Sequence, residues 1–305
     1  MNSILLIGSL NMDMVIEAPK LPVIGESLIG SGFMTTPGGK GANQAIAIAR
    51  LGGAVNMIGC VGDDSFGKRL YDNLKNNHVG THMIKTMENT STGVAVITLV
   101  NGDNCIIVDT GANNQVLPEN FEGFEDVIKE SDLVVLQMEI PFETILEVVK
   151  LAAKHGTKIL FNPAPAKQLP DNLLSQIDIL TPNESECEII TGMSISSIDD
   201  AKNAALYLMN KGVKQVVITM GKRGVVYNDG TAIAHKEPPV VKAVDTTAAG
   251  DSFTAALAVK LSKGAQINEA IEFASYVGAL TVTKKGAQES LPTLSEVEAF
   301  RKSLL

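Results

Sequence analysis

The segment Leu133-Val134-Val135-Leu136-Gln137-Met138 is short, apolar and rich in β-branched residues, which predicts a buried strand. Residues 142–155 follow it with apolar side chains at helical spacing, and residues 158–161 (Lys-Ile-Leu-Phe) predict another strand. Strands that alternate with helices in this way are typical of a parallel sheet covered by helices.

The same alternation extends over most of the 305 residues. We therefore expect an α/β fold with a mostly parallel, Rossmann-like central sheet and helices on both of its faces. Further strands are predicted at residues 4–8, 55–61, 177–180 and 215–220. Helices are predicted at residues 42–51, 65–77, 201–211, 249–263, 267–283 and 295–304.

Two regions interrupt the alternation. Residues 26–36 and 92–109 are extended in pattern, and Asn101-Gly102-Asp103 is typical of a hairpin turn. We expect them to form a small β lid, made from about residues 12–36 and 92–110, on a single catalytic domain that spans residues 1–305.

Composition excludes several classes of protein. With 25 basic and 34 acidic residues the net charge is −9, which argues against nucleic acid and anionic membranes as partners. Cys60, Cys105 and Cys187 are widely spaced and odd in number, as is typical of reduced thiols in a cytoplasmic protein. Neither a signal peptide nor a membrane-spanning apolar run is recognisable in the sequence.

The most specific motif is Asp245-Thr246-Thr247-Ala248-Ala249-Gly250-Asp251-Ser252-Phe253, before a predicted helix. Free N–H groups of residues 248–251 at a helix N-terminus would form an anion site. Asp251 beside that site fits phosphoryl transfer, in which a carboxylate orients a hydroxyl and takes its proton. The alternative is an aspartate that only caps the helix.

A second motif, Pro37-Gly38-Gly39-Lys40-Gly41-Ala42-Asn43-Gln44, opens another predicted helix. Its glycines would let the backbone approach a ligand closely, while Lys40 and Asn43 add donors. The alternative is a glycine hinge. Asn11 and Asp13 follow the first strand two residues apart, and such a pair can hold neighbouring hydroxyls or form only an Asx turn.

Three further polar groups follow predicted strands. Glu139 either accepts hydrogen bonds from a sugar or is merely solvated. Residues 183–186 (Asn-Glu-Ser-Glu) are either a site or an N-cap with an acidic first turn. Residues 219–224 (Thr-Met-Gly-Lys-Arg-Gly) suit a nucleotide, with a β-hairpin turn as the alternative.

Other patterns are rejected. Residues 62–69 approach the P-loop pattern, but Arg69 stands where a magnesium-binding Ser or Thr is required. Gly80 between His78 and His82 argues against a zinc helix.

In their order along the whole chain, these motifs resemble the ribokinase family of sugar and nucleoside kinases. Residues 38–44 are similar to the first signature of the family, and residues 245–251 to the second, which holds the anion hole and the catalytic aspartate. Residues 183–186 resemble its N-x-x-E motif. Most members have Gly-Ala-Gly-Asp where this chain has Ala248-Ala249-Gly250-Asp251, and the ribose kinases of the family share the Ala.

The resemblance implies an ATP-dependent kinase that converts D-ribose to D-ribose 5-phosphate. Asp251 would be the base, and the backbone of Ala248, Ala249 and Gly250 the anion hole. The sugar site would comprise Asn11, Asp13, Gly39, Lys40, Asn43, Glu139 and Asp251. The nucleotide site would comprise Asn183, Glu186, Thr219, Gly221, Lys222, Gly224 and Gly250.

The resemblance also implies Mg²⁺ at the nucleotide phosphates and a K⁺ site. Potassium would be held by Asp245, Thr247, Thr281, Lys284, Gly286 and Ser290, several of them through backbone carbonyls. Ser275 stands where ribose kinases can have an amide beside the adenine, which puts that contact in doubt.

The residues of the predicted sugar site favour a neutral polyol, because two carboxylates would repel a sugar phosphate and few aromatic residues are available to a nucleoside base. Fructose, another pentose or a nucleoside such as adenosine remain alternative substrates, and a non-catalytic sugar-binding protein of the same fold is the alternative function. The lid is expected to expose one face of its sheet, and members of the family often form dimers through their lids. We therefore expect a homodimer.

Overall fold

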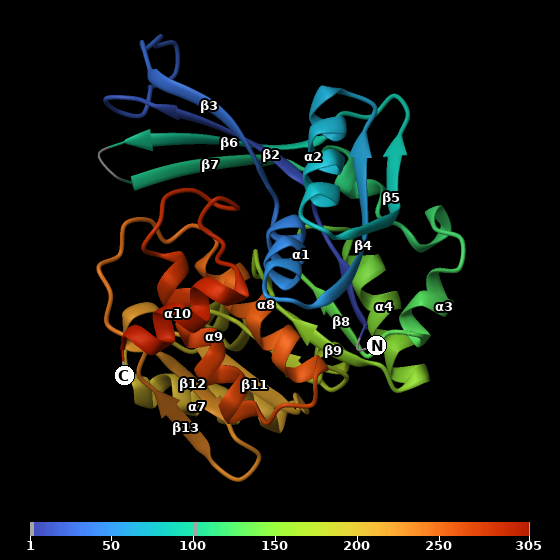
Figure 1. Cartoon of the computed structure of the whole chain (residues 1–305), viewed down its shortest axis with the longest axis vertical. Helices are drawn as coiled ribbons and strands as arrows, with labels where there is room; N and C mark the ends of the chain where they lie inside the picture. Colours follow the sequence, from blue (N-terminus) through green and yellow to red (C-terminus); the bar gives the residue numbers. More distant parts are fainter. Residues whose placement is uncertain (1–2, 101–102, 305) are drawn as a thin grey trace.

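A computed structural model describes residues 3–100 and 103–304. Two sheets organise the chain (Figure 1). In spatial order the nine-stranded sheet contains β13 (Ile233–Lys236), β12 (Val225–Asn228), β11 (Gln215–Thr219), β10 (Ile179–Leu180), β9 (Lys158–Phe161), β8 (Leu133–Leu136), β1 (Ser3–Ile7), β4 (Ala54–Gly62) and β5 (Gly80–Met87).

Neighbouring strands of this sheet run parallel from β5 to β11, and β12 and β13 add an antiparallel edge. The prediction of a mostly parallel sheet is confirmed. Its helices are α1 (Lys40–Arg50), α2 (Ser65–Asn76), α3 (Phe124–Lys129), α4 (Phe142–His155), α5 (Asp171–Leu174), α6 (Glu184–Thr191), α7 (Ile198–Asn210), α8 (Ala249–Ser262), α9 (Ile267–Thr281) and α10 (Leu294–Ser303).

Alternation along β1 divides the core between the two faces of the sheet. Ile4 and Leu6 belong to one apolar cluster, together with residues of α1, α8 and α9. Leu5 and Ile7 belong to the other, together with residues of α4 and α7. Successive side chains of a strand point to opposite faces, so helices cover both faces as predicted.

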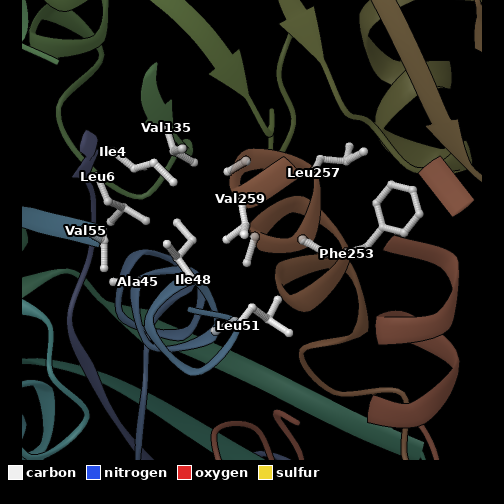
Figure 2. Packing of buried hydrophobic residues seen from close by; sticks show 14 of the residues in the cluster. Ile4, Leu6, Ala45, Ile48, Leu51, Val55, Val135, Phe253, Leu257 and Val259 are labelled. Atoms are coloured by element: carbon white, nitrogen blue, oxygen red, sulfur yellow. The ribbon is translucent and has the colours of Figure 1, made fainter. Parts of the chain in front are cut away.

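Helix α8 is the most deeply placed helix of the first cluster. Every residue from Asp251 to Val259 is buried, so the helix has no solvent-facing stripe in this part. Figure 2 shows Val259 of α8 facing Ile48 of α1, while Phe253 and Leu257 point to other sides of α8. Packing therefore surrounds α8 from Asp251 to Val259, whereas Gly250 just before Asp251 is exposed.

The smaller sheet has four strands in the order β3 (Ser31–Gly38), β2 (Asn11–Glu17), β6 (Gly93–Val100) and β7 (Asp103–Asp109). It lies across one end of the larger sheet (Figure 1). The second sheet was expected from the sequence. Residues 26–30 are nevertheless a loop and not part of a strand.

The predicted hairpin turn at Asn101-Gly102-Asp103 falls partly on residues 101–102, which lie outside the described residues. The flanking strands β6 and β7 do pair antiparallel, with Val100 opposite Asp103.

Most of the predicted elements are present, with ends displaced by a few residues. Strand β10 is shorter than the predicted 177–180, because the Ile177 N–H donates to Leu174 O and so continues the turn after α5. Strands β5 and β13 and helices α3 and α5 were not predicted, whereas α6 and β12 agree with the N-cap and hairpin alternatives for residues 183–186 and 219–224. None of the helices in the described part of the chain combines the length and apolarity that crossing a bilayer requires.

Candidate active site

The turn before α8 presents backbone N–H groups to a cavity. Ala248 is the N-cap residue with φ of 59°, an uncommon conformation for a residue with a side chain. The Ala249 N–H donates to Thr246 O at 3.2 Å. The N–H groups of Ala248, Gly250 and Asp251 have no hydrogen-bond partner within the described residues. The expectation that the N–H of Ala249 is also free is therefore wrong, because that group closes the turn.

The Asp251 carboxylate is held by side chains of α1. Asn43 Nδ2 donates to Oδ2 and Gln44 Nε2 donates to Oδ1, each at 3.0 Å. Asp251 is only 7% exposed, and its side chain caps no helix. The capping alternative is thus excluded, and the two amides fix the orientation of the carboxylate.

Further amides lie behind Gln44. Gln44 Nε2 also donates to Asn162 Oδ1 at 3.1 Å, and Gln137 Nε2 donates to Gln44 Oε1 at 2.6 Å. Gln137 Oε1 is buried without a partner within the described residues. Sequence reasoning missed Gln137 and Asn162. Both directly follow strands, β8 and β9, so the search for polar residues after strands carried the signal that could have found them.

Glu139 joins the first strand to the start of α1. Its Oε2 accepts from Ser9 Oγ at 2.5 Å and from the Lys40 N–H at 3.1 Å. Ser9 Oγ in turn accepts from the Gly41 N–H at 3.2 Å. The carboxylate of Glu139 is therefore fixed within the structure and is not merely solvated.

Asn11 and Asp13 lie two residues apart on β2, as the extended chain predicts. Asn11 Oδ1 accepts from Asn113 Nδ2 at 2.7 Å, and Asn113 Oδ1 accepts from the Leu10 N–H at 2.9 Å. Asn113 was not predicted from the sequence. Burial raises the pKa of Asp13 to about 7, with smaller contributions from the charges of Glu139, Asp251 and Glu289.

Lys40 is the cation among these acids. Burial disfavours its charged form, but the carboxylates of Asp251, Glu139 and Glu186 outweigh that effect and raise the pKa of Lys40. Lys40 therefore stays protonated at neutral pH and lies within the field of three carboxylates.

The glycines of the second motif serve packing within the protein. A Cβ at Gly39 would lie 2.7 Å from Asn11 N, and one at Gly41 would lie 2.5 Å from Ser9 N. A Cβ at Gly38 would lie 2.3 Å from Asp13 Oδ2. Approach to a ligand was the expected reason for these glycines, but the structure shows that close approach to β1 and β2 already requires them.

A cavity of about 180 Å³ collects many of the expected residues in one place. Its lining comprises Lys40, Asn162, Ala164, Thr181, Asn183, Glu186, Thr219, Thr246, Ala248, Ala249, Gly250, Asp251 and Thr254. Of these, Asn162, Ala164, Thr181, Thr246 and Thr254 were not predicted as site residues. The cavity places free N–H groups, a carboxylate and an ammonium group around one space.

Asn183 and Glu186 form a capping box at the start of α6. Asn183 Oδ1 accepts from the Glu186 N–H at 2.8 Å, and Glu186 Oε2 accepts from the Asn183 N–H at 2.9 Å. The N-cap alternative is thus present in the structure. Both residues also line the cavity, where burial raises the pKa of Glu186.

The segment after β11 is a tight connection to the antiparallel strand β12, as the hairpin alternative has it. Gly221 and Gly224 have φ of 52° and 91°, which favours glycine. The Arg223 guanidinium is engaged by Glu184. Gly221, Lys222 and Gly224 do not line the cavity, whereas Thr219 does.

Ser275 also lies away from the cavity lining. It is buried within α9, where its Oγ donates to Ile271 O at 2.8 Å.

The segments expected to hold K⁺ meet beside the turn before α8. Asp245 Oδ1 accepts from Thr247 N and Oγ1, and Asp245 Oδ2 accepts from the Gly286 N–H at 2.9 Å. The hydroxyls of Thr281 and Ser290 donate to backbone carbonyls, at 2.9 and 2.7 Å.

Lys284 Nζ pairs with Glu296 at 2.7 Å, so only its backbone is available to a cation.

The fold and the site together are those of a carbohydrate kinase. The model of the pfkB family carbohydrate kinases matches residues 1–294, and this chain belongs to that family.

Ribokinases are among its relatives. The chain is 42% identical over 298 residues to the ribokinase of Bacillus subtilis, covering 98% of this chain and 99% of that protein. It is 40% identical over 306 residues to the ribokinase of Lactococcus lactis, covering 100% and 98%. The structure of Arabidopsis thaliana ribokinase complexed with ribose and ATP superposes with a TM-score of 0.92, at 33% identity and 99% coverage of each chain.

The raised pKa of Asp13 predicts a pH-dependent stability difference. The native protein keeps a proton on Asp13 between its ordinary pKa of 3.8 and about 7, so stability falls as pH rises through this window and stays lowered above it. We expect Asp13→Asn to raise the Tm at pH 8 by at least about 2 °C. At pH 3.5, below both pKa values, the two proteins should unfold within about 1 °C of each other. Calorimetry at both pH values tests this, and an equal difference at the two values would contradict it.

Proposed function

We propose that this protein is an ATP-dependent ribokinase, which transfers the terminal phosphoryl group of ATP to D-ribose and forms D-ribose 5-phosphate. The observation that supports this most is the Asp251 carboxylate, buried and oriented beside free N–H groups in a cavity that also contains Lys40. The full-length likeness to ribokinases supports the same substrate.

Asp251 would act as the base. Its carboxylate would accept a hydrogen bond from the sugar hydroxyl and take the proton as the oxygen attacks the phosphorus. The transition state of phosphoryl transfer is loose, so the proton leaves late and a weak base suffices. The N–H groups of Ala248, Gly250 and Asp251 would stabilise the charge on the transferring group.

The sugar would lie among Asn11, Asp13, Gly39, Lys40, Asn43 and Glu139. Carboxylate and amide oxygens accept hydrogen bonds from the hydroxyls of a neutral sugar. The same carboxylates would repel a substrate that already carries a phosphate. Lys40 would contact both the sugar and the nucleotide, because it lies near Glu139 of the proposed sugar site and also lines the cavity beside Gly250.

ATP would occupy the cavity beside Asn183, Glu186, Thr219 and Gly250, with Gly221, Lys222, Gly224 and the α9 segment around Ser275 at its outer end. Mg²⁺ would be held by the phosphates and by Glu186, a half-buried carboxylate that lines the cavity. When bound, Mg²⁺ supplies charge neutralisation to the phosphate oxygens.

A K⁺ site fits the oxygen-rich group of Asp245, Thr247, Thr281 and Ser290, with backbone carbonyls of Lys284 and Gly286. Oxygen donors are those that a hard cation requires. K⁺ there would supply positive charge beside the turn that precedes α8.

A panel of acceptors tests the proposed reaction. ADP release is measured with Mg²⁺, with and without K⁺, for D-ribose, 2-deoxy-D-ribose, D-fructose, D-xylose and adenosine. We expect the highest kcat/KM for D-ribose and an activity at least severalfold higher with K⁺. If no acceptor stimulates ADP release, the protein binds sugar without catalysis. If D-fructose or adenosine gives the highest value, the substrate assignment is wrong.

Substitution of the base tests the mechanism. Asp251→Asn keeps the size of the side chain but removes its ability to take a proton, so we expect kcat for D-ribose to fall by at least about 10³-fold. ATP binding, measured by calorimetry, should change by less than about threefold. Asp199→Asn, the same change at an exposed aspartate in the first turn of α7, is the control and should leave kcat unchanged. Near-normal turnover of Asp251→Asn would contradict the role of the base.

The small sheet would serve as a lid and as the surface of a homodimer. All seven residues of β7 are exposed, and the exposed apolar side chains include Ile107 at 71% and Phe33 at 61%. Such a concentration of exposed apolar side chains marks an interaction surface more often than free surface. A second copy of the same sheet would cover it and would help to exclude water from the sugar.

Sedimentation measures the oligomeric state. We expect a dimer at micromolar concentration and a monomer for Ile107→Glu, because a buried unpaired charge destabilises an apolar interface. Leu206→Glu, on the exposed side of α7, should leave the dimer intact. A monomeric wild-type protein would refute the proposal.

The cytoplasm would be the location of this enzyme. Cys60, Cys105 and Cys187 are free thiols, and burial raises the pKa of both Cys60 and Cys187 to about 12. Thiols of this kind are typical of a reducing compartment, which also contains ATP.

A further inference from the structure

Asn43 connects Asp251 to a chain of buried amides. An ionised carboxylate can only accept hydrogen bonds, so Asn43 must direct its NH₂ group toward Asp251 Oδ2, at 3.0 Å. The carbonyl oxygen of Asn43 therefore points the other way, where it accepts from Gln288 Nε2 at 3.0 Å. Asn43 and Gln288 are 7% and 4% exposed, so water has little access to either amide.

The chain continues outward from Gln288 to a fixed charge. Gln288 Oε1 accepts from Asn73 Nδ2 at 2.6 Å. Asn77 Nδ2 donates to the Asn73 backbone oxygen at 2.9 Å and, at the longer distance of 3.4 Å, to Asn73 Oδ1. Asn77 Oδ1 accepts from Arg50 Nε at 2.9 Å. A guanidinium group can only donate, so the Arg50 end and the Asp251 end require the same direction for every amide between them.

This direction places the positive end of each amide dipole toward Asp251. Hydrogen bonds in such a chain strengthen one another, because each donor is polarised by the bond that its own carbonyl accepts. A second chain of amides, from Gln137 through Gln44 to Asp251 Oδ1, does not end on a charged donor. At its outer end, Gln137 Oε1 has no partner within the described residues.

Gln288 is the link between the chain and the loop that joins α9 to α10. Its backbone oxygen accepts from Arg50 Nη1 at 2.6 Å, and the same nitrogen donates to Leu291 O at 2.9 Å. The neighbouring Glu289 Oε1 accepts from Thr36 Oγ1 of β3 at 2.8 Å. The loop thus contacts α1 and the small sheet, and it directs one glutamine side chain inward.

We propose that Gln288 is a positioning residue for the transfer reaction: its NH₂ group binds Asn43 Oδ1 and so holds the Asn43 amide at the position from which it donates to Asp251. This inference rests on the proposed kinase function. Without the Gln288 donor, Asn43 Oδ1 is a buried acceptor that has lost its partner, and the Asn43 side chain is held on one side only. Its NH₂ group is then no longer polarised by a bond to its own oxygen, so it donates more weakly to Asp251 Oδ2 and orients the carboxylate less firmly.

The first test removes the donor with Gln288→Met, which is similar in length and uncharged. We expect kcat for D-ribose to fall between about 10- and 100-fold, in proportion to the loss of a hydrogen bond to a charged group. The KM for ATP should change by less than about twofold. Gln176→Met, at an exposed glutamine whose Nε2 donates only to Asn172 O, is the matched control and should change neither value.

The second test measures the acid limb of the pH profile of kcat, which would not change if Gln288 only stabilised the fold. Loss of the Gln288 bond weakens a donor that stabilises the charged carboxylate, so the limb should shift to higher pH in the variant. The charged groups that face Asp251 are Lys40 of α1, Asp13 of β2 and Glu186 of α6, and the substitution leaves all of them in place.

A double-mutant cycle tests whether Gln288 acts through Asn43. In an Asn43→Ala background, Gln288→Met should change kcat by less than about twofold, because the amide that it orients is gone. If Gln288→Met lowers kcat equally in both backgrounds, or leaves kcat and the acid limb unchanged in the wild-type background, the proposal is overturned.

Gln288→Glu provides a second variant should Gln288→Met fold poorly. It keeps the acceptor for Asn73 and replaces only the NH₂ group by an oxygen that faces Asn43 Oδ1. We expect it to lower kcat more than Gln288→Met, and kcat within twofold of wild type would overturn the proposal. A wild-type protein that releases no ADP with any sugar would instead refute the proposed kinase function, so the two failures are distinguishable.

Discussion

A carboxylate buried at the start of an apolar helix is the constraint that shapes this molecule. Burial of an ionised group without partners costs several kcal/mol, so such a group needs donors fixed in place around it. Asp251 receives them from Asn43 and Gln44 of α1, with Lys40 nearby. Because α8 is buried on all sides from Asp251 to Val259, the carboxylate cannot move toward solvent and its partners must come to it.

The packing of α1 follows from this requirement. To bring two successive amides to Asp251, α1 must begin close against the ends of β1 and β2. The close contacts at Gly39 and Gly41, where a Cβ would meet Asn11 N and Ser9 N, show how tightly it does so. One glycine-rich segment therefore serves two purposes: it lets α1 approach the strands, and it places the Lys40 ammonium beside the cavity.

Much of this arrangement could be predicted from local sequence. Residues 133–161 indicated the parallel sheet, and the motif at residues 245–253 indicated a helix that begins at an anion site. What could not be predicted depends on three-dimensional proximity. Nothing local to Gln288 distinguishes it from a surface glutamine, because its partner Asn43 is 245 residues away. Gln137 could have been noticed because it directly follows a strand, but its partner Gln44, 93 residues away, could not. The length of strand β10 could not be predicted for the same reason. Only two residues form it, and they are a strand because they pair with β9 and β11.

The charges of the site also explain which substrates it suits. Asp13, Glu139, Asp251 and Glu186 contribute four carboxyl groups around the single ammonium of Lys40. Asp13 relieves part of the repulsion by keeping its proton up to a pH of about 7. A phosphate already present on the sugar would add negative charge where the excess is greatest, whereas a neutral polyol would offer donors to the carboxylates and acceptors to Lys40 and Asn43. At the other end of the cavity, the free N–H groups before α8 provide the place for negative charge. The boundary between the two environments lies at Asp251, where a hydroxyl would meet a phosphoryl group.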